Sequence, residues 1–368
     1  MASTAPGTHP RPIGGSTRPE SLPAPRTARR VRRHSTARTA AGLLVAAALI
    51  AVAGYTGYAG IYGSGQFTDP AGPADCRTPL ELFGWQYEAM NYDLADDARL
   101  RADNPDMKHC ASQGSTAGTE VVTSDGVPIA GWYVPAASGV GPTGPTIVML
   151  HGWDANKSDI LRYGEALHAD YNLVAFDQRN VGRSGGTQTT MGHTEWRDVE
   201  AIIDWLVQTK GTGEIGLLAN SMGARAAVVA AVEDQRIGAL LLDSAHARLE
   251  DIVARRLDRE FEPRQPAYPG TWAILIGTSI RIGADVTAED PVRTIPQLGD
   301  TPLLVTHGGN DYIAVPAQGP EVIREVAEQA GVDVTVRYCE DAKHGQVVDV
   351  CRDAFGSWAT EFFDAAFG

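Results

Sequence analysis

Cysteine is scarce in this chain, and its four copies are too widely spread to form a metal-binding motif. No two of them stand in a C-x-x-C pair; they are Cys76, Cys110, Cys339 and Cys351. Structural zinc sites use closely spaced thiolate and imidazole ligands, so this spacing argues against one. The sequence predicts no metal site and leaves the cysteines as candidates for disulfides.

Signatures of nucleotide and nucleic-acid binding are also missing. Residues 211–216, GTGEIG, match G-x-G-x-x-G, but they follow an expected helix and enter an expected strand, the reverse of a dinucleotide-binding turn. The whole chain carries a formal net charge of -14, and an acidic surface repels nucleic acid. We therefore expect no cofactor and no nucleic-acid partner. The oligomeric state is left open.

Acidic residues are almost absent from the first 39 positions. Glu20 stands alone there against eight arginines between Arg11 and Arg38, among many prolines, serines and threonines. Such a segment has too few apolar residues to build a core. Residues 1–39 are predicted to be a disordered, basic cytoplasmic tail.

Charge is absent altogether from residues 40–62, a run long enough to cross a membrane as a helix. The arginines before it favour an N-terminus in the cytoplasm, with the rest of the chain outside. Ala51-Val52-Ala53 is also an A-x-A pattern, so cleavage would release a secreted protein beginning at Gly54. The apolar run continues past that point, which favours an uncleaved anchor in the cell membrane.

After the apolar run, the pattern of apolar and polar residues changes twice. Residues 66–115 show helical patterning and are expected to pack on the main domain through Trp85, Tyr87 and Leu94. Residues 119–135 predict two strands joined at Asp125-Gly126. Short apolar runs then alternate with helical patterns up to the C-terminus, which predicts a mostly parallel sheet with helices on both faces. Residues 244–301 leave this alternation and suggest a small cap.

Three chemically active side chains come after strands of this expected sheet. Ser221 follows 215–220, Asp311 follows the next-to-last strand and His344 follows the last. Ligands of such sheets bind at the carboxyl ends of the strands. Gly223 fits the G-x-S-x-G pattern of a nucleophile at a tight strand-to-helix turn, while Ala219 replaces the first glycine.

Several motifs stand in one order along the chain: TSDGVPIAGWYVP, HGW, DQRNVGRSGG, NSMG, HGGND and KHG. From about residue 116 onward the chain resembles the α/β-hydrolase superfamily, particularly its membrane-anchored or exported serine hydrolases of the esterase or serine-aminopeptidase kind. The resemblance implies the α/β-hydrolase fold and a catalytic triad of Ser221, Asp311 and His344. The first 115 residues lie outside it, and Ala219 departs from the family pattern.

Each triad residue has a distinct chemical role in such a site. The Ser221 hydroxyl needs a base to become a nucleophile, His344 would supply that base, and Asp311 would orient the imidazole. Backbone N–H groups of Trp153 and Met222 would form the oxyanion hole.

Other residues compete for these roles. His246 is a rival base that breaks the family order, and Asp243 is a rival acid that ends the strand after the nucleophile helix. His151 and His307 sit in HG pairs, where histidine is more often structural. Asp177 and Arg179 are expected to brace the loop under the site.

The function expected from these residues is a serine hydrolase that cleaves an ester or amide bond of a small-molecule or lipid substrate outside the cytoplasm. An acyltransferase using the same acyl-enzyme is one alternative. A non-catalytic binding protein on the same fold is another, which the complete set of triad residues argues against.

The cysteines follow the apolar run and would meet an oxidising compartment. Four cysteines allow three connectivities. Short separation favours Cys339 with Cys351 and Cys76 with Cys110, because closing a small loop costs the least chain entropy. Four buried thiols remain the alternative.

Overall fold

The computed structural model describes residues 28–69, 77–96, 99, 118–260 and 267–368. The chain divides into two compact units, Met1–Ala53 and Gly54–Gly368. Most of helix α1, Ala28–Tyr58, belongs to the first unit. The second unit contains the π-helix η1, Ala59–Gly63, the short helix α2, Ser64–Thr68, and the entire sheet.

Helix α1 begins earlier than the sequence suggested. Residues 28–39 are helical, so the expectation of disorder up to residue 39 was wrong for this part. Five of these twelve residues are arginine, which favours a helix, and a single helix needs no core of its own. The helical stretch Thr36–Thr68 contains an 18-residue window with a mean hydropathy of 1.9 and is long and apolar enough to cross a membrane, a test that a cleaved signal sequence also passes.

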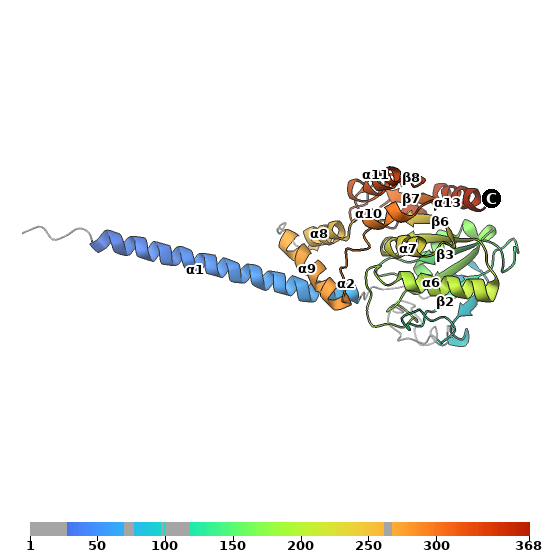
Figure 1. Cartoon of the computed structure of the whole chain (residues 1–368), viewed down its shortest axis with the longest axis horizontal. Coiled ribbons are helices and arrows are strands. Elements are labelled where there is room, and N and C mark those ends of the chain that lie inside the picture. The colour runs from blue at the N-terminus through green and yellow to red at the C-terminus, as the bar shows by residue number, and fades with distance from the viewer. Residues whose placement is uncertain (1–27, 70–76, 97–98, 100–117, 261–266) are drawn as a thin grey trace, which may run out of the picture. The chain divides into compact units, whose positions relative to one another are not determined.

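An eight-stranded sheet forms the centre of the second unit, in the order β1-β2-β4-β3-β5-β6-β7-β8 (Figure 1). Strands β3 to β8 run parallel to one another, while β2 lies antiparallel to both β1 and β4. The strands are β1 Glu88–Met90, β2 Gly131–Val134, β3 Thr146–Leu150, β4 Asn172–Phe176, β5 Ile215–Asn220, β6 Ile237–Asp243, β7 Leu303–Gly308 and β8 Val334–Cys339.

Helices cover both faces of the sheet and complete two cores. Val148 and Leu150 of β3 face the first core, whereas Ile147 and Met149 face the second, as the two-residue period of a strand requires. α6, α7 and α11 supply the first core, and η2 and α13 the second. These connecting helices are α5 Lys157–Ile160, η2 Leu161–Gly164, η3 Leu167–Ala169, α6 Trp196–Trp205, η4 Leu206–Lys210, α7 Met222–Glu233, η6 Pro316–Gln318, α11 Pro320–Ala330, α12 Val347–Val350 and α13 Arg352–Phe367.

The segment before the sheet differs from its helical pattern. Helix α3, Pro79–Phe83, ends at Gly84 in the left-handed conformation, and residues 88–90 then pair with β2 as an edge strand. Pairing with β2 satisfies backbone groups there, which overrides the weak local helical preference. Trp85 and Tyr87 do pack, against the rings of His168 and Trp132, but Leu94 is exposed.

The expected hairpin at residues 119–135 is only partly formed. A turn with Gly126 at φ 87° is present, but Val122 and Pro128 make a single bridge and the regular strand begins at Gly131. The backbone groups of β2 form hydrogen bonds with β1 and β4 instead of with a hairpin partner.

The cap lies between β6 and β7, where the strand-helix alternation was expected to stop. It comprises α8 Leu249–Glu260, α9 Ala267–Ile282, α10 Pro291–Thr294 and η5 Ile295–Gln297. η1 and α2 pack against α9, and the backbones approach so closely that a Cβ on Gly277 would lie 2.2 Å from the carbonyl oxygen of Gly60. The residues that follow the apolar helix are therefore part of the cap's packing.

Candidate active site

Ser221, His344 and Asp311 form one hydrogen-bonded chain at the carboxyl end of the sheet. The Ser221 Oγ lies 2.8 Å from Nε2 of His344, and Nδ1 of His344 lies 2.8 Å from Oδ2 of Asp311. The second carboxylate oxygen of Asp311 accepts hydrogen bonds from the backbone N–H groups of Ile313 and Ala314. The buried carboxylate is thus fixed at one oxygen and presents the other to the imidazole.

The strand-to-helix turn at Ser221 has a strained backbone. Ser221 has φ 51° and ψ −111°, an unusual conformation for a residue with a side chain, and its N–H donates to the carbonyl of Asp243. A Cβ on Gly223 would lie 2.7 Å from the carbonyl oxygen of His151, which explains the glycine after the serine. Ala219 is buried in regular β-strand pairing, so the sheet accommodates its methyl group.

Gly152, which precedes Trp153, lies close to Ser221. A Cβ on Gly152 would lie 3.4 Å from the Cβ of Ser221 and 2.8 Å from the side-chain oxygen of Asn220. Among the described residues, none accepts a hydrogen bond from the backbone N–H of Trp153 or of Met222. Within the described part of the chain, both N–H groups are therefore without an acceptor.

The Trp153 side chain is held by two segments that the sequence did not connect with the site. Its indole N–H donates to the carbonyl of Phe67, and the two rings lie 6.0 Å apart. The guanidinium of Arg256, from α8, lies 4.2 Å from the indole ring centre. The segment after the apolar helix and the cap thus both contact a residue expected in the oxyanion hole.

A buried polar network lies next to the turn at Ser221. The Asp243 carboxylate accepts hydrogen bonds from Tyr163, Asn220 and Ser244 on one oxygen and from Thr306 on the other. Burial raises the pKa of Asp243, while the hydrogen bonds from Thr306, Tyr163 and Ser244 oppose that rise. Asp243 therefore holds the turn before Ser221 and does not contact His344.

The same network reaches the loop that carries His344. The hydroxyl oxygen of Tyr163 lies 3.2 Å from the carbonyl oxygen of Gly345, and the Gly345 N–H donates to the hydroxyl of Ser244. Burial raises the pKa of Tyr163 well above its usual value, so the phenol stays protonated as a donor. Tyr163 links both sides of the site, yet no sequence motif marked it.

His151 and His307, the two histidines of the HG pairs, contact backbone groups, as expected of structural residues. Nδ1 of His151 lies 2.8 Å from the carbonyl oxygen of Gly152, and its Nε2 accepts from the N–H of Gln178. His307 Nε2 lies 2.6 Å from the carbonyl oxygen of Ala314 and 3.3 Å from Oδ2 of Asp311. Burial lowers the pKa of both imidazoles.

Asp177 and Arg179 brace the loop after β4. Asp177 pairs with Lys157 and accepts from the N–H of Arg183. Arg179 binds two carboxylates, those of Asp198 and Asp125. The loop is thereby tied to α6 and to the turn at residue 125.

His246 is buried without a hydrogen-bond partner for either ring nitrogen among the described residues. Burial, together with the charge of Arg225, lowers its pKa well below 6.5, so the ring is neutral in the folded protein. The unfolded chain binds a proton near pH 6.5, and the stability associated with the neutral ring is therefore lost as pH falls below that value.

We expect His246→Gln to remove this pH dependence. Between pH 6.5 and 5.5 the wild type should lose about 1 kcal/mol more unfolding free energy than the variant, because one proton is taken up on unfolding. Urea denaturation of the solubilised full-length chain at both pH values measures the difference. Equal losses in the two proteins would contradict the neutral buried state.

Cys339 and Cys351 are joined by a disulfide that closes the loop carrying His344. Cys339 ends β8 and Cys351 precedes α13, so the bridge ties the last strand to the last helix. The expected pairing of Cys76 with Cys110 lies outside the described residues.

Replacing both bridged cysteines by alanine should destabilise the domain by about 3 kcal/mol, as expected for a short closed loop. Turnover should fall at temperatures where the variant is still folded, because the His344 loop loses one of its restraints. Ester hydrolysis and circular dichroism, followed together with rising temperature, separate the two effects. Unchanged turnover up to the unfolding temperature would show that the bridge does not position the imidazole.

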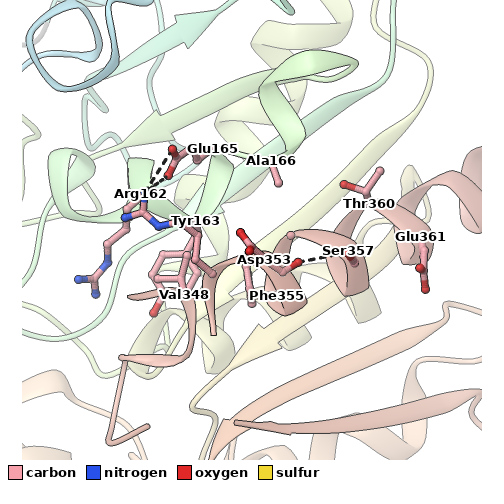
Figure 2. A pocket seen from close by; sticks show the side chains of 12 residues that line it. Arg162, Tyr163, Glu165, Ala166, Val348, Asp353, Phe355, Ser357, Thr360 and Glu361 are labelled. Carbon is pink, nitrogen blue, oxygen red and sulfur yellow. Dashed lines mark hydrogen bonds and ion pairs between the residues drawn. The ribbon is translucent and has the colours of Figure 1, made fainter. Parts of the chain in front are cut away.

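Figure 2 shows side chains that line a hollow of the domain, among them Tyr163 of the buried polar network. The hollow has a volume of about 600 Å³ and is walled by η2 and α13, with Tyr163 at its inner side. None of Ser221, Asp311 and His344 lines it. The described residues contain no cluster of three or more histidine, cysteine, aspartate or glutamate side chains that could hold a metal ion.

Comparison with known proteins agrees with the fold. Residues 145–278 match the family model of the α/β-hydrolase fold. The esterase Pf2001 of Pyrococcus furiosus superposes with a TM-score of 0.61 at 22% identity, over 82% of this chain and 99% of the esterase. At that identity the likeness shows a shared fold.

Two curated relatives are similar over part of their length. YqkD of Bacillus subtilis is 26% identical over 223 residues, covering 60% of this chain and 71% of YqkD. Rv2307c of Mycobacterium tuberculosis is 31% identical over 149 residues, and the chain spans about half of that protein (51%). The family match over residues 145–278 and the likeness to the solved structure agree that the chain has the α/β-hydrolase fold.

Proposed function

We propose that this protein is a membrane-anchored serine hydrolase that cleaves an ester or amide bond through an acyl-enzyme, with its catalytic domain outside the cytoplasm. The observation that carries the proposal is the hydrogen-bonded chain from Ser221 through His344 to Asp311 at a strained strand-to-helix turn. A merely structural serine would not need this backbone conformation or an oriented imidazole.

The reaction follows from the positions of these groups. His344 takes the Ser221 proton as the oxygen attacks the substrate carbonyl, and Asp311 holds the Nδ1–H and stabilises the imidazolium. The N–H groups of Met222 and Trp153 would bind the negative oxygen of the tetrahedral intermediate. His344 then gives the proton to the leaving group, and water releases the acyl group by the same steps.

The substrate we propose is a small-molecule or lipid ester or amide. A similar fold carries esterase activity in the Pyrococcus furiosus protein, according to its name, which supports this class without identifying the acyl group. No nucleotide, metal or other cofactor enters the proposed mechanism.

The test is cleavage of short-chain nitrophenyl esters by the full-length protein in detergent, with and without prior treatment by a fluorophosphonate. We expect turnover that the inhibitor abolishes. Added alcohol acceptors should leave nitrophenol as the product of a hydrolase, with free acid formed in equal amount. Acyl ester in place of free acid would identify an acyltransferase, and absence of both turnover and inhibitor binding would indicate a binding protein.

The proposed anchoring makes a separate prediction. The protein should remain with membranes after a carbonate wash, and protease added outside intact cells should remove its C-terminal domain. The basis is the uncharged run from Ala40 to Tyr62 behind the arginines. A mature protein that begins at Gly54 and is released to the medium would instead show that the apolar segment is a cleaved signal.

A further inference from the structure

Helix α9 of the cap exposes an apolar stripe. Between Thr271 and Ile280 its only exposed side chains are Trp272, Ile276 and Ile280, with 56%, 60% and 75% of their surface accessible. They are four residues apart, so they share one face of the helix. By contrast, most exposed residues of α11 are charged, as is usual for a helix on a protein surface. They are Glu321, Arg324, Glu325 and Glu328.

The segment at the end of the apolar run, which packs on α9, also exposes apolar side chains. Tyr58, Ile61 and Tyr62 are also more than half exposed. α9 is fastened to this segment because Arg281 donates to the carbonyl of Ile61 and to the hydroxyl of Ser64. Large contiguous apolar surfaces on a protein usually mark a contact with another molecule or with a membrane.

The sequence position of this segment favours a lipid surface over a protein partner. The uncharged run of residues 40–62 has about the length needed to cross the hydrocarbon layer, so its last residues lie near the outer interface. Tyr58 and Tyr62 are aromatic residues of the kind found at that level. Because α9 packs on residues 60–64, its exposed tryptophan lies at the same end of the anchor.

We propose that α9 is a second membrane contact, with Trp272, Ile276 and Ile280 inserted among the lipids of the outer leaflet. This inference rests on the membrane anchoring proposed above but not on the chemistry of the site. A helix lying in the interface with an apolar face needs no span of its own. The cap, which contacts Trp153 through Arg256, would then be held at the surface from which a lipid-borne substrate arrives.

The test labels single cysteines in the full-length protein, reconstituted in phosphatidylcholine vesicles. An environment-sensitive fluorophore is placed at Ile276→Cys, and the matched control is Glu325→Cys on the exposed face of α11. Labelling is done without reductant, and the wild type treated with the same reagent gives the background. A fraction of the lipids carries a nitroxide quencher near the top of the acyl chain.

We expect the label at position 276 to emit at shorter wavelength and to lose most of its intensity with quencher lipids, while the label at position 325 changes in neither respect. Vesicle-bound protein whose position-276 label emits as in water would overturn the α9 contact and leave the anchor intact. A blue-shifted label that the lipids do not quench would assign the stripe to a second copy of the chain. Protein that does not float with the vesicles would refute the anchor itself, and the α9 contact with it.

Discussion

Replacing Ser221 by alanine is expected to lower kcat for ester cleavage by about a million-fold, the loss typical of a removed nucleophile. His344→Ala should lose nearly as much, and the double variant hardly more, since the two residues act as one unit. The thermal unfolding midpoint of Ser221→Ala should stay close to that of the wild type, because among the described residues the Ser221 side chain forms a hydrogen bond with His344 alone. Steady-state hydrolysis and thermal denaturation of both single variants check this.

Substantial turnover by a folded Ser221→Ala protein would place the nucleophile elsewhere. A loss of activity that accompanied unfolding would leave the role of the hydroxyl undecided, so the denaturation curve is part of the prediction. His246→Gln is a useful control, because a buried neutral imidazole outside the hydrogen-bonded chain should not affect catalysis by a comparable factor.

The second large effect concerns the two buried aspartates that competed for the role of acid. Asp311→Asn should lower kcat by about ten-thousand-fold, because an amide can donate to Nδ1 and favours the wrong imidazole tautomer. Asp243→Asn should lower kcat far less. It should instead destabilise the protein by about 1–3 kcal/mol, because the Asn side chain cannot accept all the donors that now converge on the carboxylate.

Comparing Asp311→Asn with Asp243→Asn separates a role in catalysis from a role in stability. Turnover of each variant is compared with its free energy of unfolding in urea. A larger loss of kcat in Asp243→Asn than in Asp311→Asn would exchange the roles that the hydrogen bonds assign. A change in the pH dependence of kcat is expected for Asp311→Asn only, since Asp311 alone of the two contacts His344.

The sequence was sufficient to predict the features that depend on the order of strands and helices along the chain. Strands β3 to β8 are short apolar runs with helical patterns between them, and Ser221, Asp311 and His344 each come after a strand, so their meeting at one edge follows from a parallel sheet. The cap boundaries follow from the break in the same alternation. These are local patterns that tertiary contacts reinforce.

The contacts between distant segments could not be predicted in this way. Tyr163 reaches Asn220 and Asp243 from a separate element, and Phe67 reaches Trp153 from beyond the region of family resemblance. In a single sequence, nothing distinguishes this tyrosine or this phenylalanine from one that only packs in the core. The edge strand β1 was missed for a related reason: its three residues are a strand only because β2 offers unpaired backbone groups.

The most direct test of the central claim is to identify the residue that a fluorophosphonate modifies in the wild-type, full-length protein. Intact mass should show one adduct per chain, and peptide mapping should place it on Ser221. His344→Ala should slow the labelling strongly, because the hydroxyl then lacks its base. An adduct on another residue, or none on a folded protein that still cleaves esters, would contradict the assignment of Ser221 as the nucleophile.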